Sequence, residues 1–174
     1  MIYLKGLGAA LIITAAYLYG NGVSFYYRQR VLQLEELLVG LELFSTEVSY
    51  GLTPLPRAFI NIGAKLKGPV GAVFRDAAGE MQKNRGLSAG ECWQKALKNS
   101  AARLSLSPAG SQLLERLGLA WGKGDKNDQL RQIKLVKELL RQVHREAQDE
   151  LQKNDKVWKY LGLLGGITLV IFLL

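Results

Sequence analysis

Two stretches without charged side chains, one near each end of this 174-residue chain, constrain its fold more than any other feature. As a helix, residues 6–27 would rise roughly 33 Å, enough to cross a hydrocarbon core of about 30 Å. Residues 160–174 would reach only about 22 Å, but Lys159 can extend its ammonium group to the membrane surface, where Trp158 and Tyr160 are also favoured. A soluble core that buries so apolar a C-terminus needs more residues than this chain has. We therefore expect both stretches to lie in a membrane.

These stretches divide the chain into three expected parts: a transmembrane helix over residues 4–27, a helical bundle over residues 28–157 and a second transmembrane helix over residues 158–174. The side chains expected in the lipid or at its surface are Leu7, Leu11, Ile12, Ile13, Trp158, Tyr160, Leu169, Ile171 and Phe172. Basic residues flank the central part more densely than the two termini, and such segments tend to stay on the cytoplasmic side. We expect a cell-membrane protein with a cytoplasmic central bundle.

The first stretch also has features of a cleaved signal peptide. Lys5 would be its basic start, and Gly20-Asn21-Gly22 would supply small residues near a cleavage site. In that alternative the chain is a secreted helical binding module. The apolar character resumes at Val23 and continues to Tyr27, which favours a membrane anchor.

Apolar residues recur at steps of three and four through the central part, which is the period of an amphipathic helix. The pattern runs from Leu34 to Val48 in a first helix that continues the N-terminal segment, and from Ile133 to Leu151 in a last helix. No run of alternating β-branched residues predicts a strand. The predicted fold class is all-α: a helical bundle of about six helices flanked by an N-terminal and a C-terminal transmembrane helix.

Capping and turn residues predict where the shorter helices begin. Thr53 should cap a second helix whose first residue is Pro54. Gly68-Pro69 should separate the second helix from a third. The sequence Ser-Ala-Gly-Glu at residues 88–91 matches a capping box at the start of a fourth helix, and Ser107-Pro108 should open a fifth.

The central part carries no group of residues typical of an enzyme or a metal site. The chain has one histidine, His144, and one cysteine, Cys92, too few for a zinc site or a disulfide framework. We expect His144 at a half-exposed surface and Cys92 as a small apolar residue of the core. Residues 118–124 resemble a phosphate-binding loop only superficially, since no Ser or Thr follows Lys123. We predict a protein that is not an enzyme and needs no cofactor or metal.

The formal net charge of +8 narrows the choice of partner. Positive and negative side chains are interleaved, and no recognition motif for nucleic acid accompanies them, so a nucleic-acid partner is not expected. A positive surplus of this kind suits a domain held against an anionic cytoplasmic leaflet.

Several segments together resemble a known family. They are E-x-x-Y-G-x-T-P-L at residues 47–55, CWQKAL at residues 92–97, Gly124-Asp125 followed by Gln129, and KYLG at residues 159–162 before the apolar tail. On these residues the chain resembles the stage III sporulation protein AB family of endospore-forming bacteria, over essentially its whole length.

This resemblance implies a fold similar to the cytoplasmic six-helix domain of type II secretion F proteins. It further implies a non-enzymatic platform subunit of the assembly between mother cell and forespore, in the mother-cell membrane around the forespore. The implied partners are a cytoplasmic secretion-type ATPase and the other stage III sporulation proteins, and association between copies of the chain stays open. Taken alone, residues 47–55 also fit a simple helical-hairpin turn. The candidate partner-binding residues are Glu47, Tyr50, Gly51, Thr53, Pro54, Leu55, Gly124, Asp125 and Gln129.

Overall fold

The computed structural model describes the backbone of residues 2–50, 53–83, 86–121 and 126–173. Side chains are described within these ranges except at residues 2–13, 16–17, 19–21, 119–120, 126, 155–156 and 158–173.

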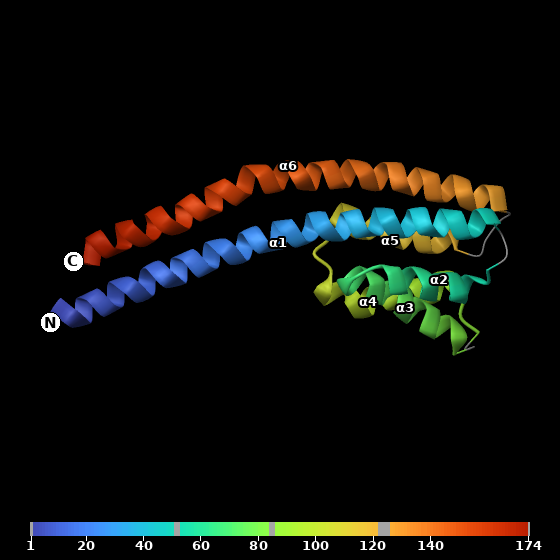
Figure 1. Cartoon of the computed structure of the whole chain (residues 1–174), viewed down its shortest axis with the longest axis horizontal. Helices are drawn as coiled ribbons and strands as arrows, with labels where there is room; N and C mark the ends of the chain where they lie inside the picture. The colour runs from blue at the N-terminus through green and yellow to red at the C-terminus, as the bar shows by residue number, and fades with distance from the viewer. Residues whose placement is uncertain (1, 51–52, 84–85, 122–125, 174) are drawn as a thin grey trace. The chain divides into compact units, whose positions relative to one another are not determined.

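Within that backbone, six α-helices and one short 3-10 helix follow one another, and no strand occurs (Figure 1). The elements are α1 (Ile2–Tyr50), α2 (Leu55–Lys65), α3 (Gly68–Gln82), α4 (Ala89–Ser100), η1 (Ala101–Arg103), α5 (Pro108–Ala120) and α6 (Lys126–Leu173). The predicted all-α class is confirmed. So is the continuity between the first amphipathic helix and the N-terminal segment, because both belong to α1.

Two of the predicted helix starts are confirmed by their hydrogen bonds. The Ser88 hydroxyl accepts from the backbone N–H of Glu91 at 3.3 Å, and the Glu91 carboxylate accepts from the N–H of Ser88 at 2.7 Å, which completes the capping box of α4. At the start of α5, the Ser107 hydroxyl accepts from the N–H of Gly110 at 3.2 Å. These side chains satisfy N–H groups that the first helical turn leaves without a partner.

The predicted start of α2 is wrong by one residue. Pro54, and not Thr53, holds the capping position, and its carbonyl accepts from the N–H of Ala58 at 3.0 Å. Pro56 then occupies the first turn of α2, where a missing N–H removes no intrahelical bond. The helix therefore starts at Leu55, and Thr53 lies before it.

The contacts divide the chain into two compact units, Met1–Val31 with Glu146–Leu174 and Leu32–Arg145. In the first unit, Arg30 Nη1 and Glu150 Oε2 form an ion pair of 2.7 Å between α1 and α6. No helix in the described part of the chain has an apolar stretch long enough to cross a membrane. The side chains expected in the lipid lie outside the described residues: Leu7, Leu11, Ile12, Ile13, Trp158, Tyr160, Leu169, Ile171 and Phe172.

The core of the second unit is a cluster of aromatic rings from five consecutive segments. Phe74 on α3 lies 5.4 Å from Phe59 on α2 and 5.1 Å from Trp93 on α4, measured between ring centroids. Trp121, directly after α5, lies 4.3 Å from Phe44 on α1 and 4.8 Å from Phe59. These four pairs meet edge to face, a geometry worth about 0.5–1.5 kcal/mol per pair beyond the area buried. The aromatic cluster thus joins the segments from α1 to the end of α5.

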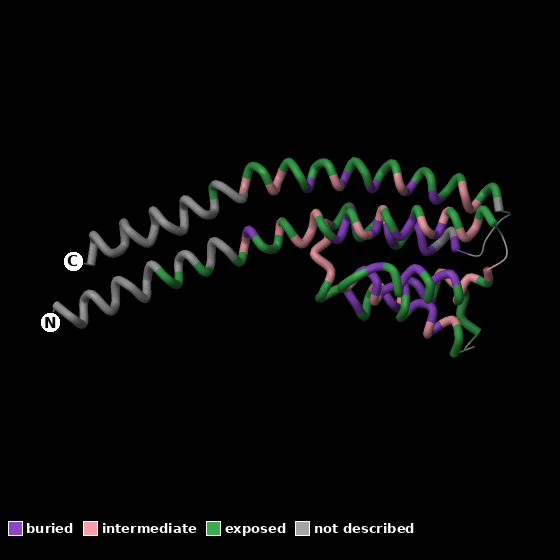
Figure 2. The backbone as a smooth tube through the Cα atoms, viewed as in Figure 1, coloured by how far each residue is buried: buried purple, intermediate pink, exposed green. Residues whose placement is uncertain are grey.

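Other buried positions recur along the inner faces of the helices around this cluster (Figure 2). Ile133, Val136 and Leu140 form the buried stripe of α6 in the second unit, as their spacing predicted. On the same helix, Lys137 forms an ion pair with Glu42 of α1. The two helices are therefore neighbours within this unit.

The two isolated residues, Cys92 and His144, lie as predicted. Cys92 is fully buried, and burial raises the pKa of its thiol, as for an unreactive core cysteine. His144 is partly exposed, and its Nε2 atom is buried without a hydrogen-bond partner among the described residues.

The close packing of α5 on Trp93 can be tested by substitution of a glycine at the contact. A Cβ atom at Gly118 would lie 2.5 Å from Trp93 Cδ1, whereas one at Gly79 on α3 would meet nothing within 4 Å. We expect Gly118→Ala to cost about 1–3 kcal/mol of folding free energy by overpacking. Gly79→Ala, the matched control, should instead stabilise the helix by about 0.5–1 kcal/mol. Thermal unfolding of the full chain in detergent measures both, and a stabilised Gly118→Ala variant would contradict the packing described.

Candidate functional site

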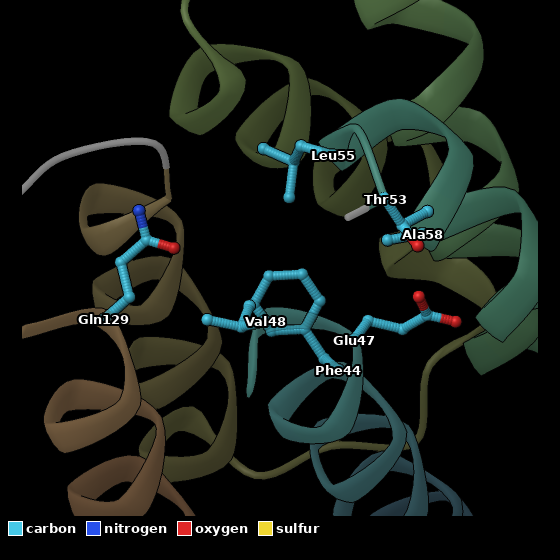
Figure 3. A pocket seen from close by; sticks show the side chains of 7 residues that line it. All are labelled: Phe44, Glu47, Val48, Thr53, Leu55, Ala58 and Gln129. Atoms are coloured by element: carbon cyan, nitrogen blue, oxygen red, sulfur yellow. The ribbon is translucent and has the colours of Figure 1, made fainter. Parts of the chain in front are cut away.

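A pocket of about 310 Å³ opens in the second unit, where the end of α1 meets the first turns of α2 and α6 (Figure 3). Its described lining residues are Phe44, Glu47, Val48, Thr53, Leu55, Ala58 and Gln129. We call it the α1–α2–α6 pocket. It brings together four of the residues proposed from the sequence as partner-binding: Glu47, Thr53, Leu55 and Gln129.

The wall that α1 contributes follows from helical spacing. Phe44, Glu47 and Val48 are three and four residues apart, so they share one face of the helix. The Phe44 ring is held from behind by Phe59 and Trp121, at centroid distances of 5.6 and 4.3 Å. This part of the wall is therefore anchored in the aromatic cluster.

The opposite wall comes from the connection between α1 and α2, the first turns of α2 and the first turn of α6. Thr53 and Leu55 lie at the entry to α2, and Ala58 follows within its first turns. Gln129 lies in the first turn of α6. Since alanine is small, Ala58 leaves space beside the Phe44 ring, which occupies the centre of the view in Figure 3.

The pocket is mainly apolar, and its polar groups have no described partners. Glu47 is the one charged residue among the described lining residues, and no described residue forms an ion pair with it. The Thr53 hydroxyl and the Gln129 amide likewise have no hydrogen-bond partner among the described groups. A few polar groups on an apolar wall are typical of a binding site.

Of the other residues proposed from the sequence, Tyr50 and Pro54 are not among the described lining residues of the pocket. Tyr50 lies three residues after Glu47 on α1 and is 77% exposed, and Pro54 is also exposed. Gly51, Gly124 and Asp125 lie outside the described residues.

Three lining residues were missed as site residues by the sequence reasoning. Phe44 and Val48 belong to the apolar stripe of the first helix and were interpreted as packing residues, whereas Ala58 follows the matched motif and was not included among the candidates. For Phe44 and Val48, the spacing around Glu47 is the signal that could have identified them as site residues, because it places a carboxylate on a mainly apolar face.

Sequence reasoning also missed a buried polar link elsewhere in this unit. Gln33 on α1 is 4% exposed, and its amide donates to the Arg103 carbonyl at 3.3 Å and accepts from the Ser105 N–H at 2.7 Å. It thereby ties α1 to the segment between η1 and α5. A single glutamine beside an apolar stripe carries no sequence signal of this role.

A second pocket, of about 370 Å³, lies along α4, η1 and the start of α5. Its lining includes Leu97, Lys98 and Glu115, and none of its described lining residues is a candidate partner-binding residue. The first pocket is therefore the stronger candidate site.

The most strongly shifted pKa in the described part of the chain belongs to a residue that lines neither pocket. The carboxylate of Glu80 on α3 accepts hydrogen bonds from Lys83 Nζ at 2.6 Å and from Lys95 Nζ at 2.5 Å. These two ammonium groups lower the pKa of Glu80 to about 2. Because Lys95 belongs to α4, the cluster ties α3 to α4. Among the described residues, no group of three or more His, Cys, Asp or Glu side chains could hold a metal ion.

Residues 5–174 match the family described as Stage III sporulation protein AB (spore_III_AB). The chain belongs to this family. It is 32% identical over 171 residues to Stage III sporulation protein AB of Bacillus subtilis (strain 168), covering 98% of this chain and 99% of that protein. A solved structure of Stage III sporulation protein AB (SpoIIIAB) aligns with a TM-score of 0.67 at 28% identity, covering 71% of this chain and 96% of the solved one.

Family membership confirms the resemblance found in the sequence. It makes the chain a sporulation protein and suggests that it acts with other stage III sporulation proteins.

The Glu80 cluster predicts how stability changes with acid. The pKa of Glu80 is about 2 in the folded chain and 4.5 ordinarily, so its contribution is complete above pH 4.5 and is lost as the pH falls toward 2. Glu80→Gln should therefore lower the melting temperature at pH 7 and have a much smaller effect near pH 2. Glu138→Gln, which removes an exposed carboxylate on α6, is the control. If Glu80→Gln lowers the melting temperature equally at pH 2 and pH 7, the ion-pair account is wrong.

Proposed function

We propose that the chain is a non-enzymatic membrane platform subunit of the channel-like sporulation complex between mother cell and forespore. In this proposal its central bundle, residues 28–157, lies in the mother-cell cytoplasm and docks a secretion-type ATPase. The observation that supports docking best is the α1–α2–α6 pocket, an apolar site whose three polar groups lack described partners, in a chain of the stage III sporulation protein AB family.

The membrane part of the proposal rests on the two uncharged stretches, residues 6–27 and 160–174. We propose that they form the transmembrane helices, over residues 4–27 and 158–174, in the mother-cell membrane around the forespore. Each stretch continues into a helix of the bundle, α1 or α6, so the bundle would be held at the membrane surface at both ends. The family match includes both stretches.

The platform role rests on the chemistry of the bundle. The described lining of the pocket offers one carboxylate and one hydroxyl, without a described second acid or base to complete a catalytic group, which suits binding better than catalysis. The Glu80 carboxylate forms ion pairs with two lysines, and these pairs explain its lowered pKa without a catalytic role. An all-α bundle that docks an ATPase also agrees with the likeness to type II secretion F domains stated from the sequence.

Membrane attachment is tested by fractionation of sporulating cells. We expect the full-length chain in the membrane pellet after an alkaline carbonate wash and in solution only after detergent is added. Its mass should correspond to residues 1–174, because a signal-peptide cut near Gly22 would shorten the chain. A carbonate-soluble chain, or one shortened at that position, would refute the double anchor.

The docking role is tested by co-purification in detergent. A tagged full-length chain should retain the stage III secretion-type ATPase and other members of the complex. A chain with Lys134→Glu, at an exposed position of α6 that is not among the described lining residues, is a control for altered surface charge and should retain the ATPase to the same extent. Recovery of the tagged chain without the ATPase or any other stage III protein would refute the platform role.

A further inference from the structure

We infer that the α1–α2–α6 pocket receives an arginine side chain of the docked partner protein. This inference rests on the proposed function, since it names the chemistry by which that docking occurs. It follows from three properties of the pocket: its apolar walls, its set of hydrogen-bond acceptors and the charge of the helix that forms one wall.

The apolar walls suit the stem of a long side chain. Phe44, Val48, Leu55 and Ala58 supply most of the lining, and the volume of about 310 Å³ is at the lower end of the range for ligand pockets, about 300–1,000 Å³. Arginine and lysine both bury their methylene groups along apolar surfaces while the charged end reaches a polar group. One such side chain therefore fits the pocket better than an extended peptide.

The polar groups of the pocket can all accept hydrogen bonds. The Glu47 carboxylate accepts at two oxygens, and the Thr53 hydroxyl and the Gln129 carbonyl accept as well. In Figure 3 the Glu47 carboxylate is directed toward Thr53 and Ala58. A guanidinium group has five donors and no acceptor, so it complements this set of acceptors.

The charge along α1 favours a cation. Residues 32–50 contain four glutamates and neither lysine nor arginine, although the whole chain has a net charge of +8. Glu42 is paired with Lys137, whereas Glu47 has no described ion-pair partner and faces the pocket. A partner cation would therefore meet the Glu47 carboxylate on a helix without basic residues nearby in sequence, and this attraction speeds association and orients the partner.

The Glu47 carboxylate favours arginine over lysine. A planar guanidinium can bind a carboxylate through two parallel hydrogen bonds, whereas an ammonium group makes only point contacts. Phe44 is 1% exposed and packs edge to face on Phe59 and Trp121, so it contributes an apolar wall fixed by the core. Tyr50, 77% exposed and one turn beyond Glu47, adds an aromatic contact for the same partner beside the pocket.

The first test uses small probes and does not depend on the identity of the partner. N-acetyl-arginine amide, N-acetyl-lysine amide and N-acetyl-leucine amide are titrated into the full chain in detergent while the NMR signals of Thr53, Leu55 and Gln129 are followed. We expect the largest shifts with the arginine probe, and at least a several-fold loss of its affinity in Glu47→Gln. Glu35→Gln, an exposed carboxylate on the same helix, is the matched control and should bind the probe as the unmodified chain does.

The second test uses the complex with the ATPase. Glu47→Gln should raise the Kd at least about tenfold and flatten its dependence on salt, because a partly buried charge pair is lost. Filling the pocket with Gln129→Trp should also abolish binding, whereas Gln132→Trp, at an exposed position on the same helix, should not. Circular dichroism and melting temperature confirm that each variant is folded.

The two tests separate failure of this inference from failure of the proposed function. Equal affinity for all three probes, or an arginine affinity unchanged in Glu47→Gln, overturns the arginine assignment even if the ATPase binds. Binding of the ATPase that is sensitive to Gln129→Trp but not to Glu47→Gln also overturns it, since an apolar anchor would then fill the pocket. If the arginine probe binds through Glu47 and the ATPase does not bind, the chemistry of the pocket stands and the proposed ATPase is the wrong partner.

Discussion

Edge-to-face packing of buried aromatic rings is the interaction on which the rest of the second unit depends. Phe44, Phe59, Phe74, Trp93 and Trp121 come from five consecutive segments and all are at most 5% exposed. Each edge-to-face pair restricts the orientation of two helices as well as burying apolar area. The same rings shape the candidate site, because Phe44 is both a member of the aromatic cluster and a wall of the α1–α2–α6 pocket.

Polar contacts connect several of the same helices that the aromatic rings bring together. The indole N–H of Trp93 donates to the Leu114 carbonyl at 2.8 Å, so the ring that meets α2 and α3 is also fixed to α5. Gln33 satisfies two backbone groups near η1, and Glu80 joins α3 to α4 through Lys95. Buried polar groups that are satisfied in this way restrict alternative packings, since a shift of one helix would leave an unpaired group behind.

Much of this fold could be predicted from the sequence, because the signals were local. Spacing of three and four marked the helices, and the Ser88–Glu91 capping box marked the start of α4. The start of α2 was placed wrongly because two prolines, Pro54 and Pro56, compete for the first helical turn, and sequence alone does not decide between them. The pairing of Trp121 with Phe44 joins residues far apart in the chain, and no local pattern predicts it.

Part of the candidate site could also be predicted, because several of its residues lie close together in the sequence. Glu47, Thr53 and Leu55 were found together because one short connection carries all three, and Gln129 was found through the family resemblance. Ala58 and Val48 were missed as site residues, since a small or apolar residue at a lining position has the same sequence pattern as one in the core. Only the tertiary arrangement distinguishes a residue that lines the pocket from one in the core.

For the proposed platform, the consequence is a docking surface with little freedom to rearrange. A partner side chain entering the pocket would contact walls set by the core, so less entropy would be lost on binding than at a loosely held surface. The pocket and the aromatic cluster are then one cooperative structure.

Hydrogen exchange of the full chain in detergent, followed at increasing denaturant, tests this cooperativity most directly. If the aromatic cluster joins the segments as described, the slowest amides of α2, α3, α4 and the α1 segment around Phe44 will open together with one free energy and one denaturant dependence. Exchange of α2, α3 and α4 at a clearly lower free energy than the α1 segment would contradict the account, because the pocket would then lose one wall while the other stayed folded.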